Sequence, residues 1–570
     1  MSNKSYFCLT VMWVLSLCTA VAFVAPAVHS APETILSGTV SSEAEGPMEG
    51  VLVKAKRQGG TITITVVSDE HGHFGFPADK ITPGQYDVSV RANGYEVPNH
   101  STSVTVGADP APIELKLKKV SPYVLVDQLT PAEVLESVPG SPRDIHAAEF
   151  CGTCHSFSRI LKSTHDADEF MDVILRMRNH TPAASIMNPV MLPFHVPNHP
   201  NDEELAKFLA SINLSSNPTW NFQFKTAPRP TGEATRVIYT EYDLPRRGAE
   251  PHDALMDSEG MVWYIDFADP VLGRLDPRTG ETKEWTLPEM KPGFPGGSLG
   301  LTLDKEGNPW IARSFQGGIA KFDRKTEKIT SYPIPKEFNN VYTRTTFIAF
   351  SPSDGKIWFD DTFNRRMYIF DPKTEKMIGY PAYPGWTFDP STSESGTGPN
   401  GEKANQFMYG VAVNSQGIGY WGDIINTYVG EMDPETGKTH LYATPTPSSS
   451  PRRLHMDQND VLWFAENNWR SRKIGMFDTK TKQFKEWGPA SPYDTPYDVA
   501  PDKSGMVWAG GETSDSVTRL DPKTGKMVDY LLPNSNVNIR RVDVDNFTNP
   551  PSMIFGENHQ AKIIIVQPLE

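Results

Sequence analysis

Residues 251–288 read PHDALMDSEGMVWYIDFADPVLGRLDPRTGETKEWTLP, and the pattern in this stretch decides the fold of most of the chain. A hydrophobic strand leads to a turn at Gly260, followed by Trp263 and, three residues later, by Asp266. An Asp-Pro-Arg-Thr-Gly turn then precedes a closing strand that ends at Pro288. Pro fixes φ and Gly supplies positive φ in such turns, so the stretch predicts short strands joined by tight turns.

The same unit recurs towards the C-terminus. Further copies are marked by Trp310, Trp358, Trp421, Trp463 and Trp508. A degenerate seventh copy, from about Asn538 to Pro568, lacks its last strand, and a matching strand lies upstream in residues 237–244. A ring closed by a strand from its opposite end has no exposed sheet edges. Residues 236–570 are therefore predicted to form a seven-bladed β-propeller.

The repeat resembles the virginiamycin B lyase-like propeller family. That resemblance implies a metal and a catalytic histidine on one propeller face. One histidine should follow a blade-opening proline, as His252 does, and a second should lie just beyond the acid after Trp-Phe. Here Glu466 is followed by Asn467 and Asn468 instead. A metal-dependent lyase or hydrolase with an accessory cytochrome domain is therefore the alternative function.

Alignment of the blades predicts which side chains line the central funnel. The first residues of the inner strands are His252, Leu299, Thr346, Tyr409, Arg452, Tyr497 and Arg540. The third residues after the blade tryptophans are Asp266, Arg313, Asp361, Asp423, Glu466, Gly511 and Glu557. Such groups suit a polar or anionic ligand or a divalent cation, and a structural ring of ion pairs is the alternative. The candidate catalytic residues are His252, Arg452 and Glu466.

Upstream of the repeat, Cys151-Gly152-Thr153-Cys154-His155 has the C-x-x-C-H spacing of covalent haem c attachment. Each thiol would add to a haem vinyl group, and His155 would be the proximal iron ligand. A thioredoxin-like pair or half of a zinc site are the alternatives. The only other cysteines, Cys8 and Cys18, lie in a segment that we expect to be removed.

Residues 122–218 around this motif read as helical. Apolar residues recur with a helical period over residues 166–177, and residues 201–212 begin with a predicted capping box of Asn201 and Glu204. The segment resembles a small class I cytochrome c, and its Met-Leu-Pro-Phe loop and last helix resemble that family's axial-methionine region. The resemblance implies that Met191 is the sixth iron ligand, with Met187 next. The histidines that could replace them are His180, His195 and His199.

The first region after the N-terminus, residues 33–119, has short alternating strands broken by Gly and Pro turns. Its landmarks are SDEHGHFGF at residues 68–76, PGQY at 83–86 and ANGY at 92–95. These resemble the carboxypeptidase regulatory-like domain, a transthyretin-like β-sandwich. The resemblance implies a binding or spacer module without catalysis.

Residues 1–30 read as a signal peptide, with Lys4 before an apolar run and with Val28 and Ser30 at the positions that a signal peptidase reads. A membrane anchor is the alternative, but Pro26 and Ala27 favour cleavage. No later stretch is long and apolar enough for a transmembrane helix. We therefore expect a bacterial protein that is periplasmic or secreted, and free of the membrane after cleavage.

Composition and motifs together predict the function. The 570 residues carry a net charge of −15, which argues against nucleic acid or an anionic membrane surface as partner. The fold expected is multidomain and mainly β, with a sandwich, a small helical cytochrome domain and a propeller. We expect an electron-transferring haem c protein with a redox partner protein and a small polar or anionic substrate in the funnel. A divalent metal in the propeller is a further candidate cofactor.

Overall fold

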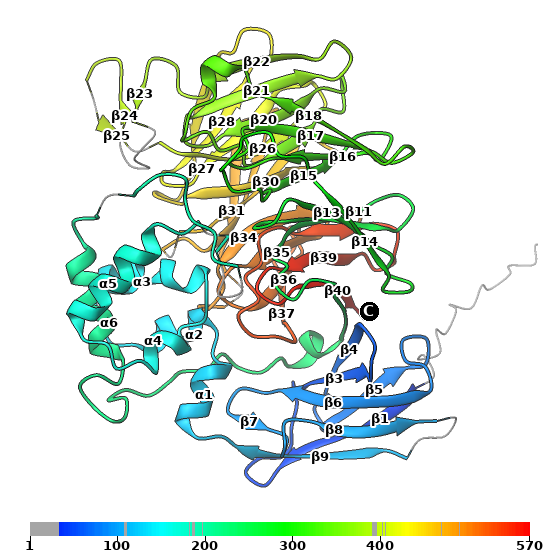
Figure 1. Cartoon of the computed structure of the whole chain (residues 1–570). Coiled ribbons are helices and arrows are strands. Elements are labelled where there is room, and N and C mark those ends of the chain that lie inside the picture. The colour runs from blue at the N-terminus through cyan, green and yellow to red at the C-terminus, as the bar shows by residue number, and fades with distance from the viewer. Residues whose placement is uncertain are drawn as a thin grey trace, which may run out of the picture.

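The computed structural model describes residues 34–569 except 108–110, 182, 185–187, 197, 390–395, 402, 405, 469 and 490. The predicted signal peptide at residues 1–30 and the candidate ligand Met187 lie outside the described residues. The described chain forms a β-sandwich, a cluster of helices and a propeller, which are blue, cyan and green to red in Figure 1.

Six four-stranded antiparallel sheets follow one another along the chain as propeller blades. The strands of the first three are β11 (Pro251–Met256), β12 (Val262–Asp266), β13 (Val271–Leu275), β14 (Thr282–Thr286), β15 (Gly300–Leu303), β16 (Pro309–Ala312), β17 (Gly318–Asp323), β18 (Lys328–Pro333), β19 (Ile348–Phe350), β20 (Ile357–Asp361), β21 (Arg366–Asp371) and β22 (Lys376–Pro381). The next three contain β26 (Met408–Val413), β27 (Gly419–Asp423), β28 (Tyr428–Met432), β29 (Thr439–Ala443), β30 (Pro451–Met456), β31 (Val461–Glu466), β32 (Lys473–Asp478), β33 (Gln483–Trp487), β34 (Pro496–Pro501), β35 (Val507–Gly511), β36 (Ser516–Leu520) and β37 (Met527–Leu531).

The seventh blade closes the ring with a strand from the opposite end of the repeat region. It consists of β38 (Asp543–Asp545), β39 (Ser552–Glu557), β40 (Lys562–Pro568) and β10 (Val237–Asp243), and β10 pairs antiparallel with β40 along its whole length. The inner strands contact one another around the ring, and the contact of β11 with β38 completes it. The predicted closing strand is thus confirmed.

The repeated tryptophans are core residues, and in several blades the indole nitrogen fixes the preceding turn. Trp263 donates to Asp257 at 2.8 Å, and the Asp257 side chain also accepts the backbone N–H of Met261. Trp310 and Trp508 repeat the bond to an aspartate six residues earlier. Each of these three tryptophans therefore buries a large apolar surface while its polar atom is satisfied, which explains the Asp–Gly–Trp spacing.

The N-terminal sandwich packs two sheets around one apolar core. One sheet contains β1 (Thr34–Ser42), β2 (Gly46–Pro47), β5 (His73–Pro77), β7 (Tyr95–Glu96) and β9 (Ile113–Lys119). The other contains β3 (Leu52–Arg57), β4 (Ile62–Val67), β6 (Gly84–Arg91) and β8 (Thr102–Val106). Strand β4 also pairs with β10, so this second sheet and the seventh blade form one continuous eight-stranded sheet.

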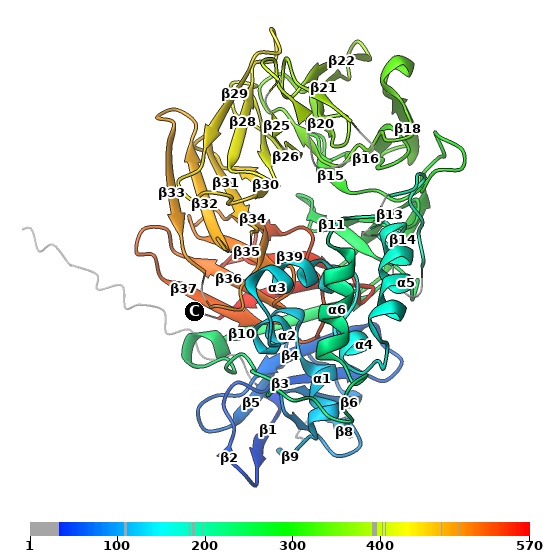
Figure 2. The same ribbon diagram turned by 90° about the vertical axis from the view of Figure 1, so that its left-hand side faces the viewer.

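The helices form a separate small apolar core of their own. They are α1 (Pro122–Gln128), α2 (Pro131–Ser137), α3 (Pro142–Glu149), the 3₁₀ turn η1 (Phe150–Thr153), α4 (Ser158–Leu161), α5 (Ala167–Arg178) and α6 (Asp202–Ile212). Short elements elsewhere are η2 (Gly232–Thr235), η3 (Lys336–Phe338) and a three-stranded sheet of β23 (Thr387–Phe388), β24 (Gly396–Thr397) and β25 (Lys403–Ala404). Figure 2 shows the helices lying in front of one side of the propeller.

The start of α6 corrects one prediction. The Asn201 side chain makes no cap to α6 and instead accepts a 3.0 Å bond from Arg143. Asp202, the first residue of the helix, is buried and binds the Arg178 guanidinium of α5. This ion pair between helices replaces the predicted Asn201–Glu204 capping box. A capping box is present instead on α5, where Asp166 and Glu169 bond each other's backbone N–H groups.

Candidate functional site at the C-x-x-C-H turn and the propeller funnel

Cys151 and Cys154 lie in and just after the 3₁₀ turn η1, which continues α3. Both are free thiols and partly buried, and Cys151 packs against the helical core. Burial raises the pKa of Cys151 to about 12 and also raises the pKa of Cys154. Reactive C-x-x-C pairs have a lowered thiol pKa at a helix N-terminus, whereas this pair follows the C-terminal end of a helix. The electrostatics therefore differ from those of a thioredoxin-like site.

His155 has the protonation and orientation that suit a metal-binding imidazole. Burial lowers its pKa, so the ring is neutral at pH 7. Its Nδ1 lies 3.2 Å from the carbonyl oxygen of Ser156, which makes Nδ1 the N–H donor. The lone pair then resides on Nε2. Metal-ligating histidines usually have this arrangement, in which a carbonyl fixes the tautomer and the ring direction.

Besides Tyr123 and Val124 of α1, three exposed apolar side chains belong to the same helical region. The exposed fractions are 68% for Phe150, 40% for Met177 and 50% for Met191. Met191 pairs through its backbone with His180, just beyond the end of α5, and Arg178 of α5 is close enough to Cys151 to influence the pKa of that thiol. The methionine segment and the cysteine turn thus both lie beside the C-terminal end of α5.

The three histidines that could replace Met191 have polar contacts of their own. His180 Nδ1 lies 3.0 Å from the Arg176 carbonyl oxygen, and His195 Nδ1 lies 3.1 Å from Asn179 Oδ1. His199 Nδ1 accepts the backbone N–H of Asn201 at 3.2 Å. Each histidine therefore has one ring nitrogen engaged within the helical region.

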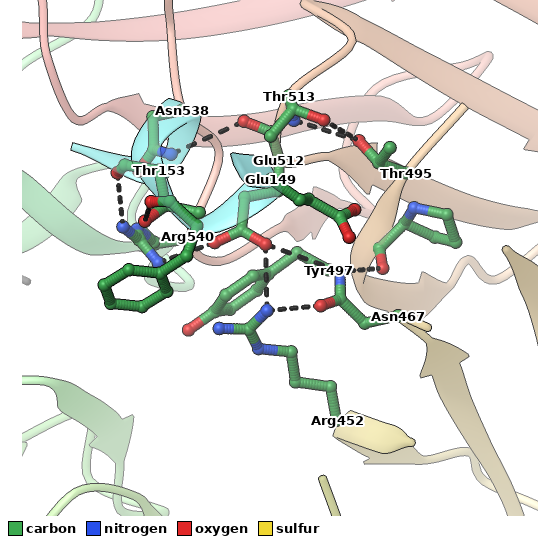
Figure 3. Close-up of polar contacts among 12 residues, drawn as sticks. Glu149, Thr153, Arg452, Asn467, Thr495, Tyr497, Glu512, Thr513, Asn538 and Arg540 are labelled. Atoms are coloured by element: carbon green, nitrogen blue, oxygen red, sulfur yellow. Dashed lines mark hydrogen bonds and ion pairs between the residues drawn. The ribbon is translucent and has the colours of Figure 1, made fainter. Parts of the chain in front are cut away.

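An arginine of the propeller holds the cysteine turn. Arg540 precedes β38, and its Nη2 donates a 2.9 Å hydrogen bond to the carbonyl oxygen of Thr153, between the two cysteines (Figure 3). Its Nη1 donates to Glu512 Oε1 at 2.8 Å, and both side chains are buried. Further along the interface, the backbone N–H of Ala132 in α2 donates to the Thr513 carbonyl. The turn is therefore docked on the face of the propeller where the inner strands begin.

The ion pair continues into the funnel. Glu512 Oε2 accepts a 2.8 Å bond from Arg452, whose guanidinium lies 4.0 Å from the centre of the Tyr497 ring (Figure 3). The hydroxyl oxygens of Tyr497 and Tyr409 are 2.5 Å apart. Burial raises the pKa of Tyr409, so this phenol stays neutral. Four predicted funnel residues, Tyr409, Arg452, Tyr497 and Arg540, are thus brought together.

A second layer of the funnel consists of residues that the sequence alignment missed. Asp253 lies 2.9 Å from Arg453 and 3.2 Å from Arg541, and Asp498 lies 3.1 Å from His455. Burial alone would raise the pKa of Asp253, but Arg453 and Arg541 hold it below its usual range. Because these residues come from different blades, the network links the blades through the centre of the ring.

Irregular strand pairing explains why neighbouring residues both reach the funnel. Register shifts follow Pro251, Pro451 and Pro496, at the start of β11, β30 and β34. Such bulges break the strict alternation of side chains. Predicted funnel positions 252, 452 and 497 are therefore accompanied by 253, 453 and 498. The sequence indicates these additional funnel residues, because two polar residues in a row follow each of the three prolines.

The residues three positions after the blade tryptophans have a different role from the one expected. We expected Asp266, Arg313, Asp361, Asp423, Glu466 and Glu557 to converge on the funnel mouth, but the structure does not bring them together. Asp266 accepts bonds from Arg246 and backbone N–H groups, and Arg313 donates to the carbonyls of Pro288 and Gly296. Asp361 accepts bonds from the Arg344 N–H and Asn364, and Asp423 accepts bonds from Tyr383 and the Phe407 N–H. Glu466 accepts a bond from Ser471, and Glu557 accepts one from Asn534. They anchor loops around their own blades.

Burial raises the pKa of four of these carboxyl groups. It raises the pKa of Asp361 to about 6, that of Asp423 to about 7, and those of Glu466 and Glu557 to about 8. Among the described residues, no group of three or more His, Cys, Asp or Glu side chains is placed to hold a metal ion.

His252 occupies a buried position at the funnel mouth. Its Nδ1 lies 2.9 Å from Asp253 Oδ1, and its ring centre is 4.5 Å from that of Phe267. Burial lowers its pKa to about 4, so the imidazole is neutral and Nδ1 donates to the carboxylate. Nε2 is buried and has no hydrogen-bond partner among the residues that the structure describes. His252 therefore presents an acceptor nitrogen, which is the form required of a general base.

Comparison with known proteins identifies the N-terminal domain. Residues 35–118 match the family model of the carboxypeptidase regulatory-like domain, which confirms the predicted sandwich. Among solved structures, virginiamycin B lyase from Staphylococcus aureus is similar at 18% identity and a TM-score of 0.48, over 58% of this chain and 99% of the lyase chain. A streptogramin B lyase is similar at 18% identity and a TM-score of 0.49, over 59% of this chain and 100% of its own.

A third similar structure is YCF48 bound to D1 peptide, at 11% identity and a TM-score of 0.43, over 58% of this chain and 95% of its own. No curated protein sequence matches the chain significantly. Within the described part of the chain, none of the helices has the length and apolar character needed to cross a membrane. The chain thus combines a carboxypeptidase regulatory-like domain with a propeller that has lyases among its structural neighbours.

Proposed function

We propose that this chain is an exported haem c protein that transfers single electrons and binds a small polar or anionic substrate in the propeller funnel. The observation that carries the proposal is the placement of the C-x-x-C-H turn, whose Thr153 carbonyl is held by Arg540 at the funnel mouth. A group attached to Cys151 and Cys154 would therefore lie beside the convergent polar residues of the propeller.

The residues of the turn fit covalent haem. The two neutral thiols would form the thioether bonds, and the Nε2 atom of His155 would be the proximal ligand. The exposed apolar side chains of Phe150, Met177 and Met191 suit contact with a flat apolar ring. Once bound, haem would supply one-electron exchange.

Met191 remains our proposed sixth ligand. Its half-exposed thioether lies in the segment that follows His180, beside the end of α5. A thioether ligand raises the reduction potential relative to a second imidazole. Six-coordinate iron would favour electron transfer over catalysis at the iron, which leaves substrate binding to the funnel.

The proposed partner is a redox protein in the bacterial periplasm or outside the cell. The net charge of −15 supports docking of a basic partner, because complementary charges accelerate encounter. The predicted signal peptide supports export, and haem c attachment in bacteria takes place in that compartment.

A pyridine haemochrome spectrum of protein produced with a haem-attachment system tests the proposal. The wild type should contain one covalent haem, while Cys151→Ala with Cys154→Ala should contain none. Thr153→Ser keeps both thiols, the hydroxyl and the backbone carbonyl that Arg540 holds, and serves as the control. A wild-type protein without covalent haem would refute the redox function.

The alternative is a lyase of the virginiamycin B type, and His252 after Pro251 is the observation that favours it. That function requires a divalent metal in the propeller. Metal analysis of the purified protein, with His252→Phe as the comparison variant, distinguishes this alternative from the redox proposal.

A further inference from the structure

The connection between the third and fourth blades carries a small sheet of its own. Residues 382–407 join β22 to β26 and contain β23, β24 and β25, and this connection is longer than those between the other blades. Figure 1 shows the small sheet standing out from the propeller on the side where the helices lie. Long connections in compact domains usually have a functional role, so the space beside this one is a candidate site.

A cavity of about 170 Å³ lies between this connection and the third blade. It is lined by Tyr383, Trp386 and Phe388 of the connection, and by residues 363–366 and Pro381 of the blade. One water molecule needs roughly 10–15 Å³ of such space, so the cavity has room for a ligand with about ten heavy atoms. That is the size of a single sugar ring.

Aromatic side chains form one wall of the cavity. The rings of Trp386 and Phe388 are stacked, with their centres 6.1 Å apart and their planes inclined by 17°. Phe388 also packs on Tyr383, whose hydroxyl donates to Asp423 at 3.1 Å and ties the wall to the fourth blade. The Trp386 side chain is only partly buried. Its π face carries negative charge density, which attracts the C–H face of a sugar ring.

Arg366 adds a cation that has no carboxylate partner. Its guanidinium carbon lies 4.0 Å from the centre of the Phe338 ring, and its Nε atom is buried without a hydrogen bond. The polar neighbours of the group are the Gly379 carbonyl, 3.3 Å from Nη2, and the neutral phenol of Tyr368. Glu337 precedes Phe338 and is exposed, but no ion pair joins it to Arg366 within the described residues. A guanidinium has five N–H donors, so several remain for an anionic ligand.

Arg365, the second arginine of the lining, has a structural role. Its buried guanidinium lies 4.5 Å from the centre of the Phe388 ring, and its Nε donates to the Gln406 carbonyl at 3.0 Å. Burial lowers its pKa, and this effect is opposed by Tyr383 and by three acidic neighbours, Asp361, Asp423 and Asp389. None of these aspartates lines the cavity. The lining thus contains two arginines and no acidic residue, and Arg366 is the one whose charge is not balanced.

We infer that this cavity binds a hexuronate, a six-membered sugar ring that carries a carboxylate. The C–H face of the ring lies on the Trp386 indole, and the carboxylate pairs with Arg366. The Thr387 hydroxyl donates to the Thr397 carbonyl at 3.3 Å and can accept a bond from a sugar hydroxyl. The site goes beyond the proposed function, because it shares no residue with the funnel and requires no haem.

Saturation-transfer NMR with D-glucuronate and D-galacturonate tests the site in the full chain. Wild-type protein should saturate the ring protons of at least one of the two sugars. Trp386→Ala should weaken that binding at least about tenfold, because the stacking surface is lost. Trp285→Ala is the matched control and should bind as wild type does. Trp285 is also partly buried and stacks on another aromatic ring, that of Trp263, on the first blade.

The carboxylate contact is tested with the neutral sugar of the same configuration, glucose or galactose. Wild type should bind the hexuronate about tenfold more tightly than its neutral counterpart, which corresponds to one charge-assisted pair. Arg366→Gln should bind the two about equally. Arg274→Gln is the matched control, because Arg274 lies 5.6 Å from the centre of the Trp263 ring on the first blade. It should keep the wild-type preference.

Three results would overturn the inference. They are the absence of saturation transfer to both hexuronates in wild type, equal hexuronate affinity in wild type and a folded Trp386→Ala variant, and retention of the full preference by Arg366→Gln. If Trp386→Ala does not fold, benzoate decides in its place, because it is a flat aromatic acid without sugar hydroxyls. Benzoate bound by wild type as tightly as the hexuronate would show that the cavity takes aromatic acids, whereas clearly weaker benzoate binding supports the sugar site.

Discussion

The Arg540 guanidinium of the propeller donates a 2.9 Å hydrogen bond to the carbonyl oxygen of Thr153, in the middle of the C-x-x-C-H turn. The two residues are 387 positions apart in the sequence. The same guanidinium pairs with Glu512, which in turn binds Arg452 over the Tyr497 ring. One buried ion-pair chain thus joins the cysteine turn to the funnel.

Arg540→Gln should loosen this junction. The substitution removes the donor to Thr153 and one of the two cations that neutralise Glu512, so we expect a loss of about 3 to 5 kcal/mol in stability, typical of breaking a buried pair. Hydrogen exchange of the amides of residues 150–155 should accelerate relative to wild type. Arg366→Gln should leave that exchange unchanged, and equal protection in both variants would argue against the junction.

Met191→Ala should open one axial position of the bound haem. Loss of a thioether ligand lowers the reduction potential and lets carbon monoxide bind the reduced iron. Absorption spectroscopy and a potentiometric titration measure both effects. Met177→Ala, which removes another exposed methionine on α5, should not allow carbon monoxide to bind. If Met187→Ala gives the effects expected of Met191→Ala, then Met187 is the ligand.

Thr65→Pro should uncouple the N-terminal sandwich from the propeller. Thr65 lies in β4 between Lys54 of β3 and Tyr239 of β10, where proline removes a backbone donor from the middle of the continuous sheet. Calorimetry should show these two domains unfolding together in wild type and separately in the variant. Thr65→Val keeps the donor and should match wild type. Separate transitions in wild type would contradict the coupling.

Glu466→Gln should flatten part of the pH dependence of stability. Burial raises the folded-state pKa of Glu466 to about 8, above the ordinary 4.5, so the folded state holds a proton that the unfolded state has lost. Stability from this group is full below about pH 4.5 and falls as pH rises towards 8, by up to about 1.4 kcal/mol per unit. The variant should therefore match wild type at pH 4.5 and exceed it at pH 8 in denaturant unfolding. A constant difference across that range would show that Glu466 is ionised in the folded protein.

The propeller was predictable because each blade repeats its own turn chemistry. The Asp257–Trp263 bond and the Asp-Pro-x-Thr-Gly turns are local, and they recur in register along the chain. The missing strand of the last blade could be found because residues 237–244 carry the pattern of a closing strand. Helix α5 was likewise predictable from its apolar period.

The funnel was only partly predictable, because alternation rules fail at bulges. The alignment found His252, Arg452 and Tyr497, but the register shifts after the blade-opening prolines bring in Asp253, Arg453 and Asp498 as well. The alignment predicts that Asp266, Asp361, Asp423 and Glu466, each three residues after a blade tryptophan, reach the funnel, yet they bind loops. The docking of Thr153 on Arg540 and the pairing of β4 with β10 join separate domains, and neither has a local sequence signal.

The central claim is that the cysteine turn carries a covalent haem at the funnel mouth. Intact-mass spectrometry of protein exported from a host with a haem-attachment system tests it most directly. The account predicts that the mass of the mature wild-type chain exceeds that of its polypeptide by one haem, and that Cys151→Ala with Cys154→Ala shows the polypeptide mass alone. A wild-type chain with the bare polypeptide mass and two titratable thiols would contradict it.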